Sequence, residues 1–136
     1  MCSNVFCKQA VISGLFFWVL IFIEISVIGF TPGLASMSDH GFILHPPGIV
    51  IHLILVILIT FFLGRAILKK QTSLPTIKTA VTLGITWLMV GTFLDVIITV
   101  PFFVKSYCIY FSKWALWVGY LLVLITLMSI ARPRKT

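Results

Sequence analysis

The sequence is poor in charge, and above all in acidic residues. Aspartate and glutamate number only 3 in 136 residues, and charged residues together make up 10%, against about 25% in ordinary soluble domains. Hydrophobic residues make up 60%, and the mean hydropathy is +1.18. This composition excludes a disordered segment and a water-soluble enzyme, because neither tolerates so much apolar surface with so few charges. It predicts an integral membrane protein.

Motifs that carry chemistry are also lacking. The three cysteines, Cys2, Cys7 and Cys108, form no C-x-x-C pair, which excludes the thiol-redox enzymes that need a vicinal pair. The sequence has no glycine-rich phosphate loop and no motif for a serine or cysteine nucleophile. We therefore expect no catalytic residue, no cofactor-binding residue and no cofactor, and we lean toward a chain that is not an enzyme.

Four apolar segments are long enough to cross a bilayer, which takes about 20 residues of helix. They cover residues 10–30, 48–68, 79–104 and 114–130. Each must be helical, because a segment in lipid has to satisfy its own backbone hydrogen bonds. The predicted fold is all-α: a single transmembrane domain over residues 1–136, with four helices in an antiparallel bundle.

Prolines and glycines mark the limits of these segments. Pro32 ends the first span, Pro46 and Pro47 open the second, and Pro101 is expected to bend or end the third. The first segment could instead be a cleaved signal peptide. We favour a span, because the apolar run exceeds the about 7–15 residues of a signal core and Glu24 interrupts it.

The basic residues indicate the orientation. The loop 31–47 has no lysine or arginine, and of the 10 basic residues only Lys105 and Lys113 lie on the same side as this loop. The positive-inside rule therefore places both termini in the cytoplasm. Because the charges flank apolar runs, the predicted partner is the lipid bilayer and not nucleic acid. The basic residues of the cytoplasmic side are Lys8, Arg65, Lys69, Lys70, Lys78, Arg132, Arg134 and Lys135, and an outer aromatic belt is expected from Tyr107, Tyr110, Trp114 and Trp117.

Two carboxylates and a histidine lie well inside the apolar segments. In the predicted topology Glu24, His52 and Asp95 fall at similar depth in the outer half of the membrane, where a charge costs several kcal/mol. We expect these three residues to form a polar intramembrane cluster. It could be structural pairing or snorkelling toward the interface, a proton- or ion-linked site, or a metal site. The weak metal candidates are His45, His52, Glu24 and Asp95, and His45-x6-His52 is no recognised ligand spacing.

The third segment carries small residues at helical spacing. Gly84 and Gly91 lie on one face with Asp95, and small residues allow helices to approach closely in a membrane. We expect this face to pack against the other spans or, alternatively, against a second copy of the chain.

The second half of the sequence resembles a known group of proteins. The stretches Gly84-Ile85-Thr86-Trp87-Leu88 and Leu94-Asp95 are followed by Pro101, Tyr107, Tyr110 and Gly119-Tyr120. This pattern is similar to that of uncharacterised prokaryotic four-span small integral membrane proteins, which have a loose G-x-x-W-L…L-D third span. The resemblance implies the cytoplasmic (inner) membrane of a prokaryote and a multi-pass topology. It implies no activity, and it makes Asp95 an intramembrane acid that is structural or proton-linked.

Three functions remain open at this point. The first is a non-catalytic subunit or scaffold that packs against itself or against a larger membrane complex. The second is a small proton- or ion-linked transporter that uses Glu24 and Asp95. The third is a membrane metal-binding protein that uses His45, His52 and a carboxylate. We favour the first, because the chain is small and lacks a catalytic constellation.

Overall fold

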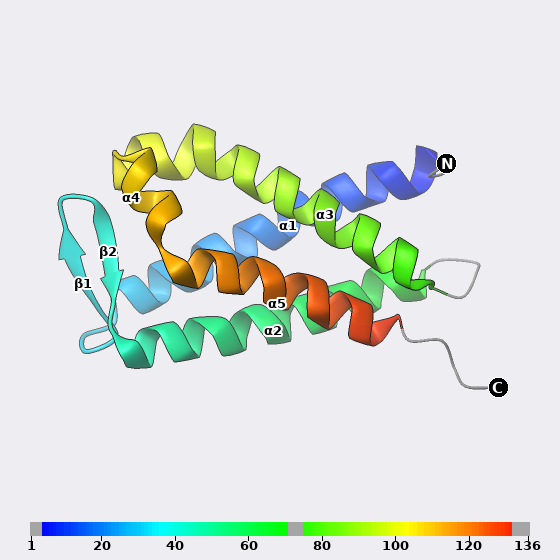
Figure 1. The fold of residues 1–136 in the computed structure, drawn as a ribbon, viewed down its shortest axis with the longest axis horizontal. Helices are drawn as coiled ribbons and strands as arrows, with labels where there is room; N and C mark the ends of the chain where they lie inside the picture. Colours follow the sequence, from blue (N-terminus) through cyan, green and yellow to red (C-terminus); the bar gives the residue numbers. More distant parts are fainter. Residues whose placement is uncertain (1–3, 71–74, 132–136) are drawn as a thin grey trace.

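The computed structural model describes residues 4–70 and 75–131, and most of them are helical (Figure 1). Helix α1 covers Asn4–Gly29, α2 covers Pro46–Lys69, α3 covers Ile77–Leu94 and α5 covers Trp114–Ile130. Helix α3 continues directly into a π-helix, η1, over Asp95–Val104.

In the described part of the chain three helices are long and apolar enough to cross a membrane: α1, α2 and the continuous helix Ile77–Val104. The fourth apolar helix, α5, is shorter, with 17 residues. The chain thus has the length and composition of a multi-span helical membrane protein. Each of the four predicted segments corresponds to one of these helices.

The helices begin where the sequence supplies a suitable first turn. Pro46 and Pro47 occupy the first positions of α2, where the missing N–H costs nothing. The side chain of Thr76 accepts a hydrogen bond from the backbone N–H of Thr79 and caps α3. The prediction that Pro46 and Pro47 open the second span is confirmed.

Successive long helices run in opposite directions along the molecule (Figure 1). Helix α1 packs against α3 and α2, and α5 packs against α2 and α3. The core contains Leu83, Trp87 and Leu127, all without exposed surface. Trp87 stacks on Phe17, with 4.9 Å between the ring centroids.

Gly84 lies at a close helix contact within the chain. A Cβ atom at Gly84 would lie 2.7 Å from Cδ2 of Leu124 in α5, so a larger residue here would have to displace the Leu124 side chain, whereas glycine allows the close approach of α3 and α5. A Cβ atom at Gly91 would have only Trp18 nearby, at 3.8 Å. At Gly84 the face of small residues therefore packs against α5 of the same chain.

Two short elements were not predicted from the sequence. Strands β1 (Ala35–Ser38) and β2 (Gly41–Leu44) form an antiparallel hairpin, so the fold is mostly helical and not purely all-α. Helix α4 (Tyr107–Ser112) is capped by the Ser106 side chain, which accepts from the N–H of Ile109. Both elements are too short to give a periodic hydrophobic pattern.

The third helix passes Pro101 without ending there. It changes register at Asp95 and ends at Val104, three residues beyond the proline that we expected to bend or end it. At its end the N–H of Lys105 donates to the carbonyl of Val100 at 2.6 Å, a spacing of five residues. Lys105 has a left-handed conformation (φ 60°), which ends the helix.

The loops divide between the two ends of the bundle. The hairpin and α4 lie at one end, and both ends of the described chain lie at the other, together with the last turn of α2 and the first turn of α3 (Figure 1). Lys105 and Lys113 adjoin α4. The other basic residues that the structure describes belong to or adjoin α1, α2 and α3 near the opposite end: Lys8, Arg65, Lys69, Lys70 and Lys78. Cys2, Arg132, Arg134 and Lys135 lie outside the described residues, so the predictions made for them stay predictions.

Candidate functional site

Glu24 of α1 and His52 of α2 form a buried pair. Nδ1 of His52 lies 2.8 Å from Oε2 and 3.1 Å from Oε1 of Glu24. Glu24 is 8% exposed and His52 is 7% exposed, so the Glu24 carboxylate does not snorkel to the surface. The pair joins the first two long helices with a charge-assisted hydrogen bond.

The sequence of α2 explains why His52 faces inward. Apart from Ile67, the buried positions of α2 recur every four residues and form a stripe that turns gradually around the helix. His52 is the second member of this series, so the apolar pattern around it turns its ring toward the bundle. The series consists of Gly48, His52, Val56, Thr60, Gly64 and Leu68.

Asp95 lies in a separate hydrogen-bonded group at the junction of α3 and η1. Its Oδ1 accepts from Nε1 of Trp18 at 2.9 Å and from the hydroxyl of Thr99 at 2.7 Å. Its Oδ2 accepts from the hydroxyl of Tyr110 at 2.5 Å. Three donors from α1, η1 and α4 thus surround this carboxylate.

Tyr110 is held as a hydrogen-bond donor by its surroundings. Burial raises the pKa of its phenol, and the nearby Asp95 charge and the hydrogen bond to Asp95 raise this pKa further. The phenol therefore stays protonated at any physiological pH. On the same end of the bundle, burial lowers the pKa of Lys113, whose ammonium lies 3.4 Å from the carbonyl of Phe42 in β2.

The three ionisable residues expected to cluster are thus found in two hydrogen-bonded groups. Glu24 and His52 meet, whereas Asp95 bonds to Trp18, Thr99 and Tyr110. The spacing from Trp18 to Glu24 is about 9 Å along α1 and roughly 120° around it. Helix α1 therefore contributes to both groups from different faces.

In the described part of the chain, the His45 side chain makes no hydrogen bond to either group. It is the N-cap residue of α2, and its backbone N–H donates to the carbonyl of Leu34 at 2.8 Å. Among residues 4–70 and 75–131, no three His, Cys, Asp or Glu side chains gather in a way that could hold a metal ion. The geometry thus offers a pair, not a ligand set.

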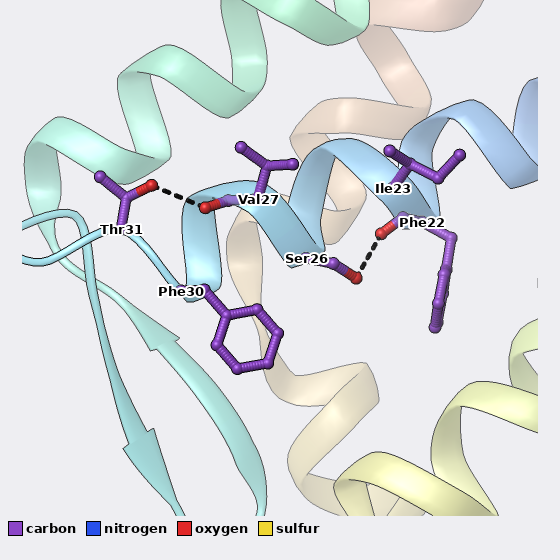
Figure 2. Close-up of a pocket in the computed structure, with 6 residues that line it drawn as sticks. All are labelled: Phe22, Ile23, Ser26, Val27, Phe30 and Thr31. Carbon is purple, nitrogen blue, oxygen red and sulfur yellow. Dashed lines mark hydrogen bonds between the residues drawn. The ribbon is translucent and has the colours of Figure 1, made fainter.

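An open hollow of about 450 Å³ lies on the surface of α1 (Figure 2). Its two polar side chains bond to backbone carbonyls of α1: the Ser26 hydroxyl donates to the carbonyl of Phe22, and the Thr31 hydroxyl donates to that of Val27. Neither Glu24, His52 nor Asp95 lines it. The lining residues are Phe22, Ile23, Ser26, Val27, Phe30 and Thr31.

Sequence reasoning missed the partners of Asp95. We expected Tyr110 in an outer aromatic belt, and the sequence pattern gave no role to Trp18. Thr99 follows Asp95 by one helical turn, a spacing that favours contact, and this was the one signal available. The contacts from Trp18 and Tyr110 depend on helix rotation and on the position of α4.

We predict that the Glu24–His52 pair stabilises the bundle as a unit. Glu24→Leu or His52→Leu alone should lower the free energy of unfolding by about 3–5 kcal/mol, because each leaves a buried partner unpaired. The double variant should recover most of this loss, since two apolar side chains replace the pair. Unfolding in mixed detergent micelles measures the effect.

Ser26→Ala is the matched control, because the Ser26 hydroxyl bonds only within α1; it should leave stability unchanged. If the double variant loses as much free energy of unfolding as the two single variants together, the pair is not the stabilising unit.

Comparison with known proteins gives no relative from which a role could be transferred. No family model matches the chain, and no curated protein or solved structure matches it significantly. The fold and the two polar groups are therefore the basis for any statement about function.

Proposed function

We propose that this small multi-span membrane protein is a non-catalytic subunit or scaffold of a membrane assembly. The observation that carries the proposal is the engagement of its intramembrane polar groups. Both carboxylates and the histidine of the apolar helices bond to donors or acceptors on another element. Groups used in this way join helices together and are not presented to a substrate.

The proposed topology has four spans, with both termini in the cytoplasm of a prokaryote and the hairpin outside the inner membrane. Its support is the bias of basic residues toward the end of the bundle that carries both ends of the described chain. The resemblance of the second half to prokaryotic four-span proteins agrees with it. Helix α5, at about 26 Å, is close to the about 30 Å of the hydrocarbon core.

A partner would bind a face that the chain does not use itself. Gly84 already contacts α5, so this part of the third helix is occupied. The apolar side chains on the outer faces of the helices, among them Phe62, Met89 and Phe93, are largely exposed. In a bilayer these faces meet either lipid or the helices of a partner.

We predict that Cys108 is accessible from outside the cell. A chain with Cys2→Ser and Cys7→Ser retains only Cys108, which is exposed in α4. A membrane-impermeant maleimide should label this chain in intact cells. A chain with Cys2→Ser and Cys108→Ser should be labelled only after the membrane is opened, and the reverse result would invert the topology.

We predict that conservative changes in the polar groups leave the assembly intact. In Asp95→Asn the remaining oxygen can still accept from Trp18 and Thr99, and in His52→Gln the amide can still donate to Glu24. Native gels of complexes purified in mild detergent should show one particle, larger than the single chain, for the wild type and both variants. A wild-type protein that migrates as a single chain at native expression levels would contradict the assembly role.

A second candidate is a small proton-linked transporter, favoured by the Glu24–His52 pair. A carboxylate and an imidazole 2.8 Å apart in a buried position can share or exchange a proton. Intramembrane acids and histidines with such partners form proton relays in transporters. In this function Glu24 and Asp95 would be the two protonation sites.

Proton flux separates this candidate from the first. In proteoliposomes that contain a pH-sensitive dye, an imposed membrane potential should drive flux through the wild type. Glu24→Gln together with Asp95→Asn should reduce this flux at least about tenfold, because both protonation sites are lost. Asp39→Asn is the matched control, because it changes the remaining acid of the chain. Equal flux in all variants, or none in the wild type, would remove the transporter.

A further inference from the structure

The π-helix η1 contains a gap in its own hydrogen bonding. In a π-helix the carbonyl of each residue accepts from the N–H five positions later. For the carbonyl of Val96 that position is Pro101, which has no N–H. The bond from Lys105 to Val100 shows the five-residue spacing at the other end of η1. The sequence therefore leaves the Val96 carbonyl without its donor.

A tyrosine from the next helix occupies this gap. The hydroxyl of Tyr107, the first residue of α4, donates to the carbonyl of Val96 at 3.1 Å. Three residues later, on the same face of α4, the hydroxyl of Tyr110 donates to Asp95 at 2.5 Å. Two tyrosine hydroxyls of α4 thus donate hydrogen bonds to two consecutive residues, Asp95 and Val96, at the point where α3 changes into η1.

We propose that α4 is a clamp that holds Asp95–Val104 in the π-helical register, with the Tyr107 hydroxyl in place of the hydrogen that Pro101 cannot donate. The clamp is independent of the proposed function, because it concerns only how one end of the bundle keeps its conformation. An α-helical register is the competing state. In that register Pro101 would face the carbonyl of Ile97 with its ring, which kinks or breaks a helix.

The register matters beyond η1 itself. A shift by one residue rotates the following residues by about 100° around the helix. Nδ1 of His40 lies 3.1 Å from the carbonyl of Val104, so such a rotation would also break the contact between the hairpin and η1. The α4 clamp therefore fixes the position of the hairpin as well as that of the π-helix.

A double-mutant cycle tests the α4 clamp in the full chain in lipid nanodiscs. Hydrogen–deuterium exchange of peptides that cover residues 95–104 is the readout. Tyr107→Phe keeps the ring but removes the donor, and it should speed exchange roughly three- to tenfold. In a Pro101→Ala background the new N–H can bond to Val96, so Tyr107→Phe should change exchange by less than about twofold.

The controls separate the clamp from a general loss of structure. Tyr120→Phe removes a tyrosine hydroxyl that bonds to Thr92, away from the proline gap, and should leave exchange in residues 95–104 unchanged. Peptides from α2 report unfolding of the whole bundle. The α4 clamp is overturned if Tyr107→Phe has the same effect in both backgrounds, has no effect in the native background, or speeds exchange in α2 as much as in η1.

Discussion

A polar group inside a bilayer has no water to bond to, and the fold follows from how most of the polar groups meet this constraint. Among the buried side chains that the structure describes, the Thr60 hydroxyl is the exception, because it has no hydrogen-bond partner. Most groups meet the constraint within their own helix. The hydroxyls of Ser26, Thr86 and Ser129 donate to carbonyls four residues earlier, as is usual for such residues in apolar helices. These residues need no partner helix. The contacts between helices at such positions can therefore be purely apolar.

Other polar groups bond across elements, among them Trp87 to Ser13 and Thr92 to Tyr120. Three acceptors in particular determine contacts between elements. A carboxylate accepts only, so Glu24 takes its donor from α2 and Asp95 takes donors from α1 and α4 as well as from its own helix. The Val96 carbonyl has lost its donor to Pro101 and takes one from Tyr107. Acceptors that lack a donor in their own helix thus bond to donors of other elements, and such hydrogen bonds hold membrane helices together.

The spans could be predicted from the sequence because hydropathy and length decide them. The meeting of Glu24 and His52 was also foreseeable, because both residues fall at similar depth on successive helices. The separation of Asp95 from them was not foreseeable, since a rotation of about 100° per residue decides which neighbour it faces. The hairpin and α4 carry no periodic signal over four and six residues. The π-helix could not be predicted either, because its proposed donor, Tyr107, follows it in sequence and reaches Val96 only in the folded chain.

The arrangement of the polar groups also bears on what the protein can do. The Glu24–His52 pair is buried between α1 and α2, and the hollow on α1 does not include it. A proton could reach the pair only if the two helices moved apart or if water entered between them. Such motion would separate the charge from its partner at the cost of a buried, unpaired group. The free energy needed to separate the pair helps to keep a scaffold in one conformation. A transporter would have to supply the same free energy in every cycle.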